Sequence, residues 1–165
     1  MSETYVECLV KQKQSGVKKF LKGLLIVVAV IMFFAMMIIP FAFIFALAAG
    51  AGAYVMHLFS DLEYEYLYMD RELVIDKIMA KTRRKRVGTY TLDRMEILAP
   101  IKSYHLDNYK NRTASKVKDY SIGEELKPDR RFVMFYEGGE KVLLSPSEEM
   151  IKAMRNVSPR KIFND

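Results

Sequence analysis

The sequence predicts an α+β protein in which a two-helix transmembrane hairpin is followed by a small antiparallel β-domain with a C-terminal capping helix. Three observations carry this prediction: an uncharged apolar run from Gly23 to Ser60, alternating segments from Leu62 onward, and an amphipathic segment near Pro146. A long apolar run indicates membrane helices, whereas alternation with a period of two indicates strands. Several strands followed by one helix are typical of the α+β class.

Charge and cysteine content exclude few functions. The 165 residues carry a formal charge of +6 and a single cysteine, Cys8, so a disulfide within the chain is impossible. Residues 1–22 hold five lysines against two glutamates, and residues 61–165 hold 21 basic against 18 acidic residues. Neither part is basic enough for charge alone to indicate a nucleic-acid partner.

The uncharged run is too long for one transmembrane helix. Its 38 residues would extend about 57 Å as a single helix, whereas the apolar core of a bilayer is about 30 Å thick. Pro40 lies near the middle and interrupts helical hydrogen bonding, so we expect two spans at about 22–39 and 40–58. A re-entrant loop and a single kinked span stay open as alternatives, because the turn at 36–43 contains no polar residue.

A signal peptide is the other alternative, because residues 46–53 resemble a small-residue cleavage site. The apolar run before this site exceeds 20 residues, which is longer than the apolar region of a secretory signal. We instead expect the small residues to form a face that allows close approach of the first helix. The residues of this face are Ala46, Ala49, Gly50 and Ala53.

Flanking charges predict the orientation of the hairpin. Five lysines precede the first span: Lys11, Lys13, Lys18, Lys19 and Lys22. The connection between the spans carries no charge, so the positive-inside rule puts the N-terminus and the C-terminal domain in the cytoplasm. We therefore divide the chain into a basic cytoplasmic segment at 1–21, the transmembrane hairpin at 22–59, a β-domain at 60–158 and a frayed tail at 159–165.

Strands account for the first part of the β-domain. Tyrosines at 64, 66 and 68 alternate with Glu65 and Leu67, which predicts a strand with the tyrosines on one face. A polar break at 70–72 and the segments that follow predict three more strands, at about 73–80, 84–92 and 93–101, the last ended by Pro100. Residues 101–130 are the least regular part, with one strand expected at 117–122.

The C-terminal part predicts a hairpin and a helix. Gly138 and Gly139 provide the positive φ angles of a tight turn within 131–146. Ser145 as N-cap, Pro146 at the first helical position and Glu148 three residues after the cap predict a helix at about 146–157. Its apolar positions are Met150, Ile151, Met154 and Val157, which we expect to cover an opening in a bent sheet.

The predicted strands include the sequence segments "EYEY" at 63–66 and "LDRMEILAP" at 92–100. With two apolar helices before it, this pattern resembles bacterial pleckstrin-homology-like membrane proteins, and more closely a bacterial family of small two-span proteins named as a domain of unknown function. The resemblance implies a cytoplasmic pleckstrin-homology-like barrel closed by the helix at 146–157, and it carries no functional residues. Pleckstrin domains that bind phosphoinositides generally place basic residues in the first hairpin loop. The loop at 70–72 is short and net acidic, so inositide binding is not expected.

We predict no catalytic residue, no metal site and no cofactor. His57 ends the apolar run, and His105 precedes Asp107 by two residues without a nearby nucleophile. Motifs for zinc, nucleotides or phosphate loops do not occur in the sequence. We therefore expect a protein that is not an enzyme and that has no small-molecule substrate or nucleic-acid partner.

The one candidate site is a basic cluster: Lys81, Arg83, Arg84, Lys85 and Arg86. A solvated hairpin connection is its simplest interpretation. The functional alternative is contact with anionic lipid headgroups, where each basic residue contributes about 1 kcal/mol. The hairpin from 64 to 90 leaves the predicted membrane surface and returns to it, which would bring the cluster back to the headgroups.

Three hypotheses about function follow. The first is a non-enzymatic membrane protein whose cytoplasmic β-domain makes contacts with other proteins or with further copies of itself. The second is a module that senses anionic lipids through the cluster at 81–86. The third is an accessory subunit of a transport or secretion complex. The expected partners are the lipid bilayer and a second copy or another membrane protein.

Overall fold

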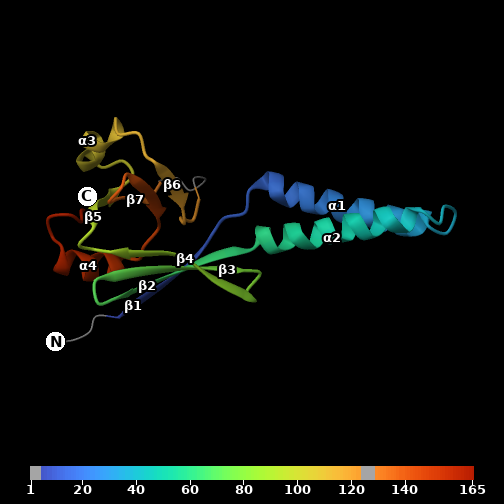
Figure 1. Ribbon diagram of the computed structural model, residues 1–165, viewed down its shortest axis with the longest axis horizontal. Helices are drawn as coiled ribbons and strands as arrows, with labels where there is room; N and C mark the ends of the chain where they lie inside the picture. The colour runs from blue at the N-terminus through green and yellow to red at the C-terminus, as the bar shows by residue number, and fades with distance from the viewer. Residues whose placement is uncertain (1–4, 124–128) are drawn as a thin grey trace. The chain divides into compact units, whose positions relative to one another are not determined.

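The computed structural model describes residues 5–123 and 129–165 (Figure 1). The described chain forms two compact units. The helical unit contains residues 14–62 and 79–83, and the β-unit contains the described parts of 1–13, 63–78 and 84–165. Each unit is built from segments that lie far apart in the sequence.

Two helices make up most of the helical unit. Helix α1 spans Gly16–Ala35 and helix α2 spans Ala42–Ser60, and the two lie side by side (Figure 1). The expected break at Pro40 is confirmed, since Pro40 lies in the turn between them. Among the helices of the described residues, α2 is the one that is long and apolar enough to cross a bilayer. Three lysines of α1, at 18, 19 and 22, shorten its uncharged part.

The first sheet contains a strand that the sequence analysis did not predict. Within the described residues its order is β1-β2-β3-β4. The bounds are β1 Val6–Lys11, β2 Leu62–Met69, β3 Glu72–Met79 and β4 Arg83–Thr91. Strand β1 precedes the helices and pairs antiparallel with β2, which follows them. The helical hairpin is therefore an insertion between the first two strands, and the β-unit extends beyond the expected 60–158.

The register of β1 and β2 explains the alternating tyrosines. Val10 lies opposite Tyr64 and Cys8 lies opposite Tyr66, so the tyrosines share one face with the apolar positions of β1. Tyr66 is fully buried, donates a 2.5 Å hydrogen bond to the carbonyl of Tyr120 and accepts one from the amide of Ser145. The predicted placement of the tyrosines on one buried face is confirmed.

The second sheet has the order β5-β7-β8-β6 in the described residues. Its strands are β5 Met95–Pro100, β6 Lys116–Asp119, β7 Phe132–Tyr136 and β8 Glu140–Leu144. Between β5 and β6 lie the short helices η1 Tyr104–Leu106 and α3 Asp107–Lys110. Gly138 and Gly139 have φ angles of 86° and 77°, which confirms the predicted turn between β7 and β8.

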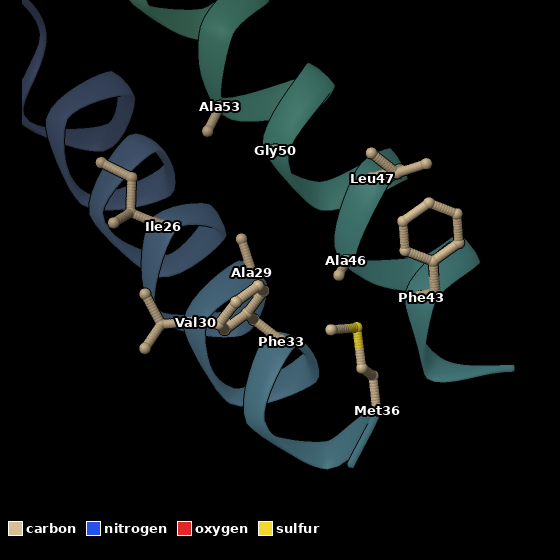
Figure 2. A pocket seen from close by; sticks show the side chains of 10 residues that line it. All are labelled: Ile26, Ala29, Val30, Phe33, Met36, Phe43, Ala46, Leu47, Gly50 and Ala53. Atoms are coloured by element: carbon tan, nitrogen blue, oxygen red, sulfur yellow. The ribbon is translucent and has the colours of Figure 1, made fainter. Parts of the chain in front are cut away.

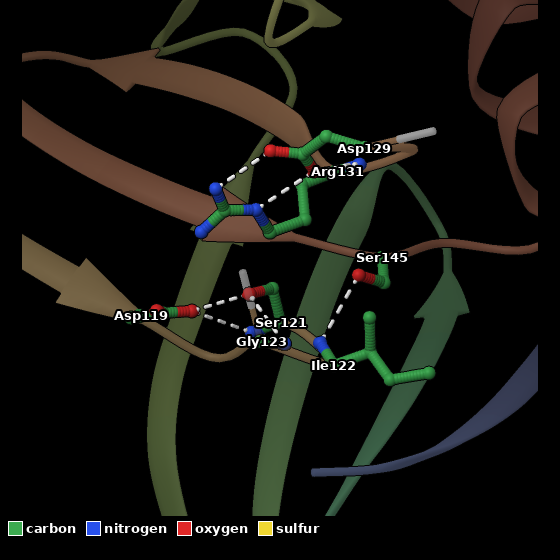
Figure 3. Close-up of polar contacts among 7 residues, drawn as sticks. All are labelled: Asp119, Ser121, Ile122, Gly123, Asp129, Arg131 and Ser145. Carbon is green, nitrogen blue, oxygen red and sulfur yellow. Dashed lines mark hydrogen bonds and ion pairs between the residues drawn. The ribbon is translucent and has the colours of Figure 1, made fainter. Parts of the chain in front are cut away.

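Local hydrogen bonds end β6 earlier than the sequence analysis expected. The Asp119 carboxylate accepts hydrogen bonds from the amide and the hydroxyl of Ser121, which turns the chain (Figure 3). The Ile122 amide then donates to the hydroxyl of Ser145 at 3.1 Å. Ser145 therefore joins the segment after β6 to the end of β8 and is not the N-cap of the final helix.

Helix α4 spans Glu148–Val157 and is capped by Ser147, whose hydroxyl accepts a hydrogen bond from the Met150 amide at 3.3 Å. The predicted cap at Ser145 is therefore wrong by two residues. Met150, Ile151 and Met154 are buried in the core between the sheets, as expected. Val157 differs from the expectation, since it is 39% exposed at the end of the helix.

The C-terminal tail is not frayed. The Leu98 amide donates to the carbonyl of Lys161 at 2.8 Å, and the Phe163 amide donates to the carbonyl of Leu98 at 2.9 Å. Ile162 is fully buried between these two bonds. The tail therefore continues the sheet along the edge of β5 and protects that edge.

Replacement of Ile162 tests the structural role of the tail. We expect Ile162→Ala to lower the free energy of unfolding by about 3 kcal/mol, because it leaves a cavity in a fully buried site. Arg160→Ala, at an exposed position, is the matched control and should change stability by less than about 0.5 kcal/mol. Chemical unfolding of the purified protein, followed by tyrosine fluorescence, measures both. Equal stability of the two variants would show that the tail does not pack.

A polar network joins the two sheets of the β-unit. The Tyr90 hydroxyl donates to the Glu140 carboxylate at 2.7 Å, and the Lys118 ammonium donates to the same oxygen at 2.8 Å. Burial raises the pKa of Glu140, but the hydrogen bonds from Lys118 and Tyr90 outweigh burial and leave that pKa below its ordinary value. In the same unit, hydrogen bonds from Arg131 lower the pKa of Asp129 (Figure 3).

The lowered pKa of Glu140 predicts how stability depends on pH. A carboxylate whose pKa is lower in the folded state stabilises the fold above its unfolded pKa, about 4.3, and this contribution is lost as the pH falls. We expect the Tm of the wild type to fall more steeply below about pH 4.5 than that of Glu140→Gln. Glu137→Gln, at an exposed carboxylate, should keep the wild-type profile. Thermal unfolding between pH 3 and 7 measures the difference, and parallel profiles for all three proteins would contradict the network.

Candidate functional site

The turn between β3 and β4 lies against the end of α2 within the helical unit. Ala80 and Lys81 have φ angles of 47° and 58°, and the Thr82 amide donates to the carbonyl of Met79 at 3.1 Å. The Ala80 amide donates to the carbonyl of Asp61, the residue after α2, at 2.9 Å. The turn that begins the basic cluster is therefore fixed beside the residue at which the chain leaves α2.

Cations of the helical unit gather at this same end. Lys18, Lys19 and Lys22 lie in the first turns of α1, and Lys81 and Arg83 lie in and after the β3–β4 turn. The Lys22 ammonium and the Nδ1 atom of His57 are 3.0 Å apart, which joins the start of α1 to the last turn of α2. The connection at 36–41 carries no charge, so the hairpin has one basic and one apolar end.

The predicted basic residues divide into two groups. Arg84 pairs with Glu65 and lies 3.6 Å from Asp76, and Arg86 lies 3.4 Å from Asp76. The two carboxylate side chains are 10% and 7% exposed, so these arginines neutralise buried charge on the sheet. Both arginines therefore have carboxylate partners on the sheet.

The second group consists of Lys81, Arg83 and Lys85. Their side chains are exposed, and none of them forms an ion pair within the described residues. Along β4, successive side chains point to opposite faces, which separates Arg83 and Lys85 from the two paired arginines. Three of the five predicted residues are thus available to an anionic partner.

The histidines have structural contacts. His105 stacks on Phe163 with ring centroids 3.7 Å apart, so it holds the C-terminal tail, and His57 contacts Lys22 as described. Among the described residues, no group of three or more His, Cys, Asp or Glu side chains could hold a metal ion.

Three of the four residues of the predicted small face of α2 line an apolar groove of about 460 Å³, and Ala49 does not (Figure 2). Ala46, Gly50 and Ala53 line one wall, and larger side chains of α1, among them Ile26 and Phe33, line the other. A Cβ at Gly50 would meet no atom within 4 Å in the described structure, so the helices do not touch there. The close approach occurs at Gly52 instead, where a Cβ would lie 3.7 Å from Leu25.

The fold and the site define a small β-sheet domain that is closed by a C-terminal helix and that carries a helical hairpin between its first two strands. A model of the family described as Bacterial PH-like domain (DUF6106) matches residues 2–164. The chain therefore belongs to this bacterial PH-like family, whose function is unknown. No curated protein and no solved structure matches the chain.

Because β1 is the first strand of the sheet, the turn at 70–72 is not the first connection, which is the one that pleckstrin domains use for phosphoinositides. The first connection of the sheet is the helical insertion with its lysines, and the turn at Asp70 and Arg71 is the second connection, since Glu72 already belongs to β3. The charge of residues 70–72 at the second connection is therefore no argument against lipid contact at the first.

The division of the basic cluster predicts unequal effects of substitutions at positions 83 and 84 on stability. We expect Arg84→Met to destabilise the protein by about 2 kcal/mol, because it leaves the buried Glu65 carboxylate without its cation. Arg83→Met, next to it on the opposite face, should change stability by less than about 0.5 kcal/mol. Glu65→Met in the Arg84→Met background should restore part of the loss. Urea unfolding of the four proteins measures these differences, and equal effects at positions 83 and 84 would contradict the division.

Proposed function

We propose that the chain is a two-span membrane protein whose PH-like domain lies in the cytoplasm and makes contacts with other proteins, without enzymatic activity. The pairing of β1 with β2 is the observation that carries the proposed topology. Lys11 and Glu63 are opposite one another in one sheet, and the entire helical hairpin lies between them in the sequence. Two segments of one sheet share a compartment, so the hairpin crosses the membrane an even number of times.

The surface of the helices supports membrane insertion. Large apolar side chains along both helices are exposed, for example Phe34 at 64% and Phe45 at 65%, and Ile38 in the connection is 86% exposed. Exposed apolar surface of this extent is unfavourable in water and favourable in hydrocarbon. The lysines at one end of the hairpin favour the cytoplasm for that end.

Cysteine accessibility tests the topology. In a Cys8→Ser background, Ile38→Cys should react with a membrane-impermeant maleimide added to intact cells. Asp165→Cys should react after the membrane is permeabilised. Labelling of Asp165→Cys from outside would contradict cytoplasmic termini, and protection of Ile38→Cys on both sides would favour a re-entrant loop.

Contact with anionic lipids is a second candidate function, favoured by the bond between Ala80 and Asp61. This bond holds Lys81 and Arg83 beside the end of α2, where the proposed topology puts the headgroups. Two cations at about 1 kcal/mol each correspond to a preference of about thirtyfold for an anionic over a neutral lipid. The contact should weaken with salt, because exposed charges are screened beyond about 8 Å at physiological ionic strength.

Lipids that co-purify with the full-length protein test this second function. We expect the ratio of phosphatidylglycerol to phosphatidylethanolamine to fall severalfold in the variant Lys81→Gln, Arg83→Gln. The double variant Lys152→Gln, Arg155→Gln, which removes two exposed cations of α4, should keep the wild-type ratio. Quantitative mass spectrometry measures the ratios at low and high salt. A ratio that changes in neither variant, or that does not depend on salt, would remove the lipid hypothesis.

A further inference from the structure

The outer face of the second sheet carries its own apolar cluster, separate from the core between the sheets. Its buried residues are Ile97, Ala99, Leu106, Val133 and Phe135. Helices η1 and α3 cover part of this face, since Leu106 packs into the cluster and Tyr109 stacks on Phe135 with centroids 4.9 Å apart. Val117 of the edge strand β6 stays exposed beside these helices.

A pocket of about 200 Å³ lies beside α3 on this face. The strand registers bring Phe135 of β7, Lys141 of β8 and Val117 of β6 into one row across the sheet, and all three line the pocket. Val117 is 62% exposed, so the apolar floor continues onto an accessible edge strand. The pocket therefore has an apolar floor that solvent reaches from one side.

The lining of the pocket is positive. Among the described residues that line it are Lys110, Arg112 and Lys141, and this described lining includes neither aspartate nor glutamate. Lys110 pairs with Asp107, and Arg112 pairs with Glu96 at 2.7 Å, so both have carboxylate partners outside the pocket. Lys141 is half-buried and forms no ion pair within the described residues. A charge that is partly removed from water is unfavourable until an anion joins it.

We propose that this pocket binds an acidic segment of a partner protein, with one apolar side chain of the partner in the pocket and a neighbouring carboxylate on Lys141. The volume favours this occupant, because pockets for small molecules usually measure about 300–1,000 Å³. A space of 200 Å³ suits a single large side chain. Buried apolar anchors of this kind, flanked by charges, dominate binding at protein interfaces. This assignment rests on the proposed role of the domain in protein contacts.

Binding of model peptides to the full-length protein in nanodiscs of neutral lipid tests the assignment. The probe is a fluorescent peptide with a central leucine between glutamates, and its controls carry a central alanine or lysines in place of the glutamates. We expect Lys141→Met to weaken binding of the probe about tenfold by anisotropy, and Val117→Asp to abolish it. Lys152→Met, at an exposed lysine of α4, should bind as the wild type does.

Several outcomes would overturn the assignment. Equal binding by Lys141→Met and Lys152→Met would remove the role of Lys141. Equal binding of the leucine and alanine peptides would remove the anchor. Millimolar glutarate carries two carboxylates but no apolar side chain. Complete displacement of the probe by glutarate would show that the pocket is a site for a small anion.

Crosslinking in membranes separates this assignment from the proposed function on which it rests. A photoreactive side chain is introduced at Val117 in one protein and at Met69, an exposed position of β2, in another. Crosslinks at Val117 that the acidic peptide suppresses would support the assignment. Crosslinks to protein at Met69 but not at Val117 would overturn the pocket and leave protein contacts in place. Absence of crosslinks at both positions would count against protein contacts altogether.

Discussion

The antiparallel pairing of β1 with β2 is the constraint on which the rest of the structure depends. It joins residues on both sides of the helical hairpin into one sheet, with Val10 opposite Tyr64 and Lys11 opposite Glu63. The apolar side of this pair supplies Val10 and the three tyrosines to the core, against which Met150 and Met154 of α4 pack. Because Lys11 and Glu63 are opposite one another, the chain leaves β1 for the helical hairpin and returns from it to β2 at the same end of this strand pair. One ladder of hydrogen bonds thus joins the strand before the helices to the strand after them.

Much of this fold could be predicted from local patterns. Strands β2 to β5 follow from alternation, and the turn at Gly138 and Gly139 follows from the residues that tolerate positive φ. Strand β1 was missed because "VECLVK" is short and its partner lies beyond the entire hairpin, so no local signal indicates the pairing. The buried tail was missed for a similar reason. Ile162 is a single apolar residue in a polar segment, and its contact with Leu98 is remote in sequence.

The roles of single residues in the candidate site could not be predicted from local sequence patterns either. The run of charge at 81–86 is visible in the sequence, but the roles of its members depend on pairing across strands. Arg84 and Arg86 are held by Glu65 and Asp76, which come from β2 and β3, and their neighbours face the other way. The positive pocket on the second sheet could not be predicted either. Its residues come from α3, β6, β7 and β8, and Lys141 gains its apolar surroundings through strand register alone.

The position of the hairpin inside the sheet has a consequence for biogenesis. Strand β1 leaves the ribosome before the helices, and it cannot complete its sheet until β2 has also emerged. With the proposed topology, a chain whose second helix failed to return would hold β1 and β2 on opposite sides of the bilayer. The β-unit would then expose the tyrosine face of β2, a substrate for membrane proteases and chaperones. With that topology, folding of the domain would depend on correct insertion, because β1 can pair with β2 only when both strands lie on the same side of the membrane.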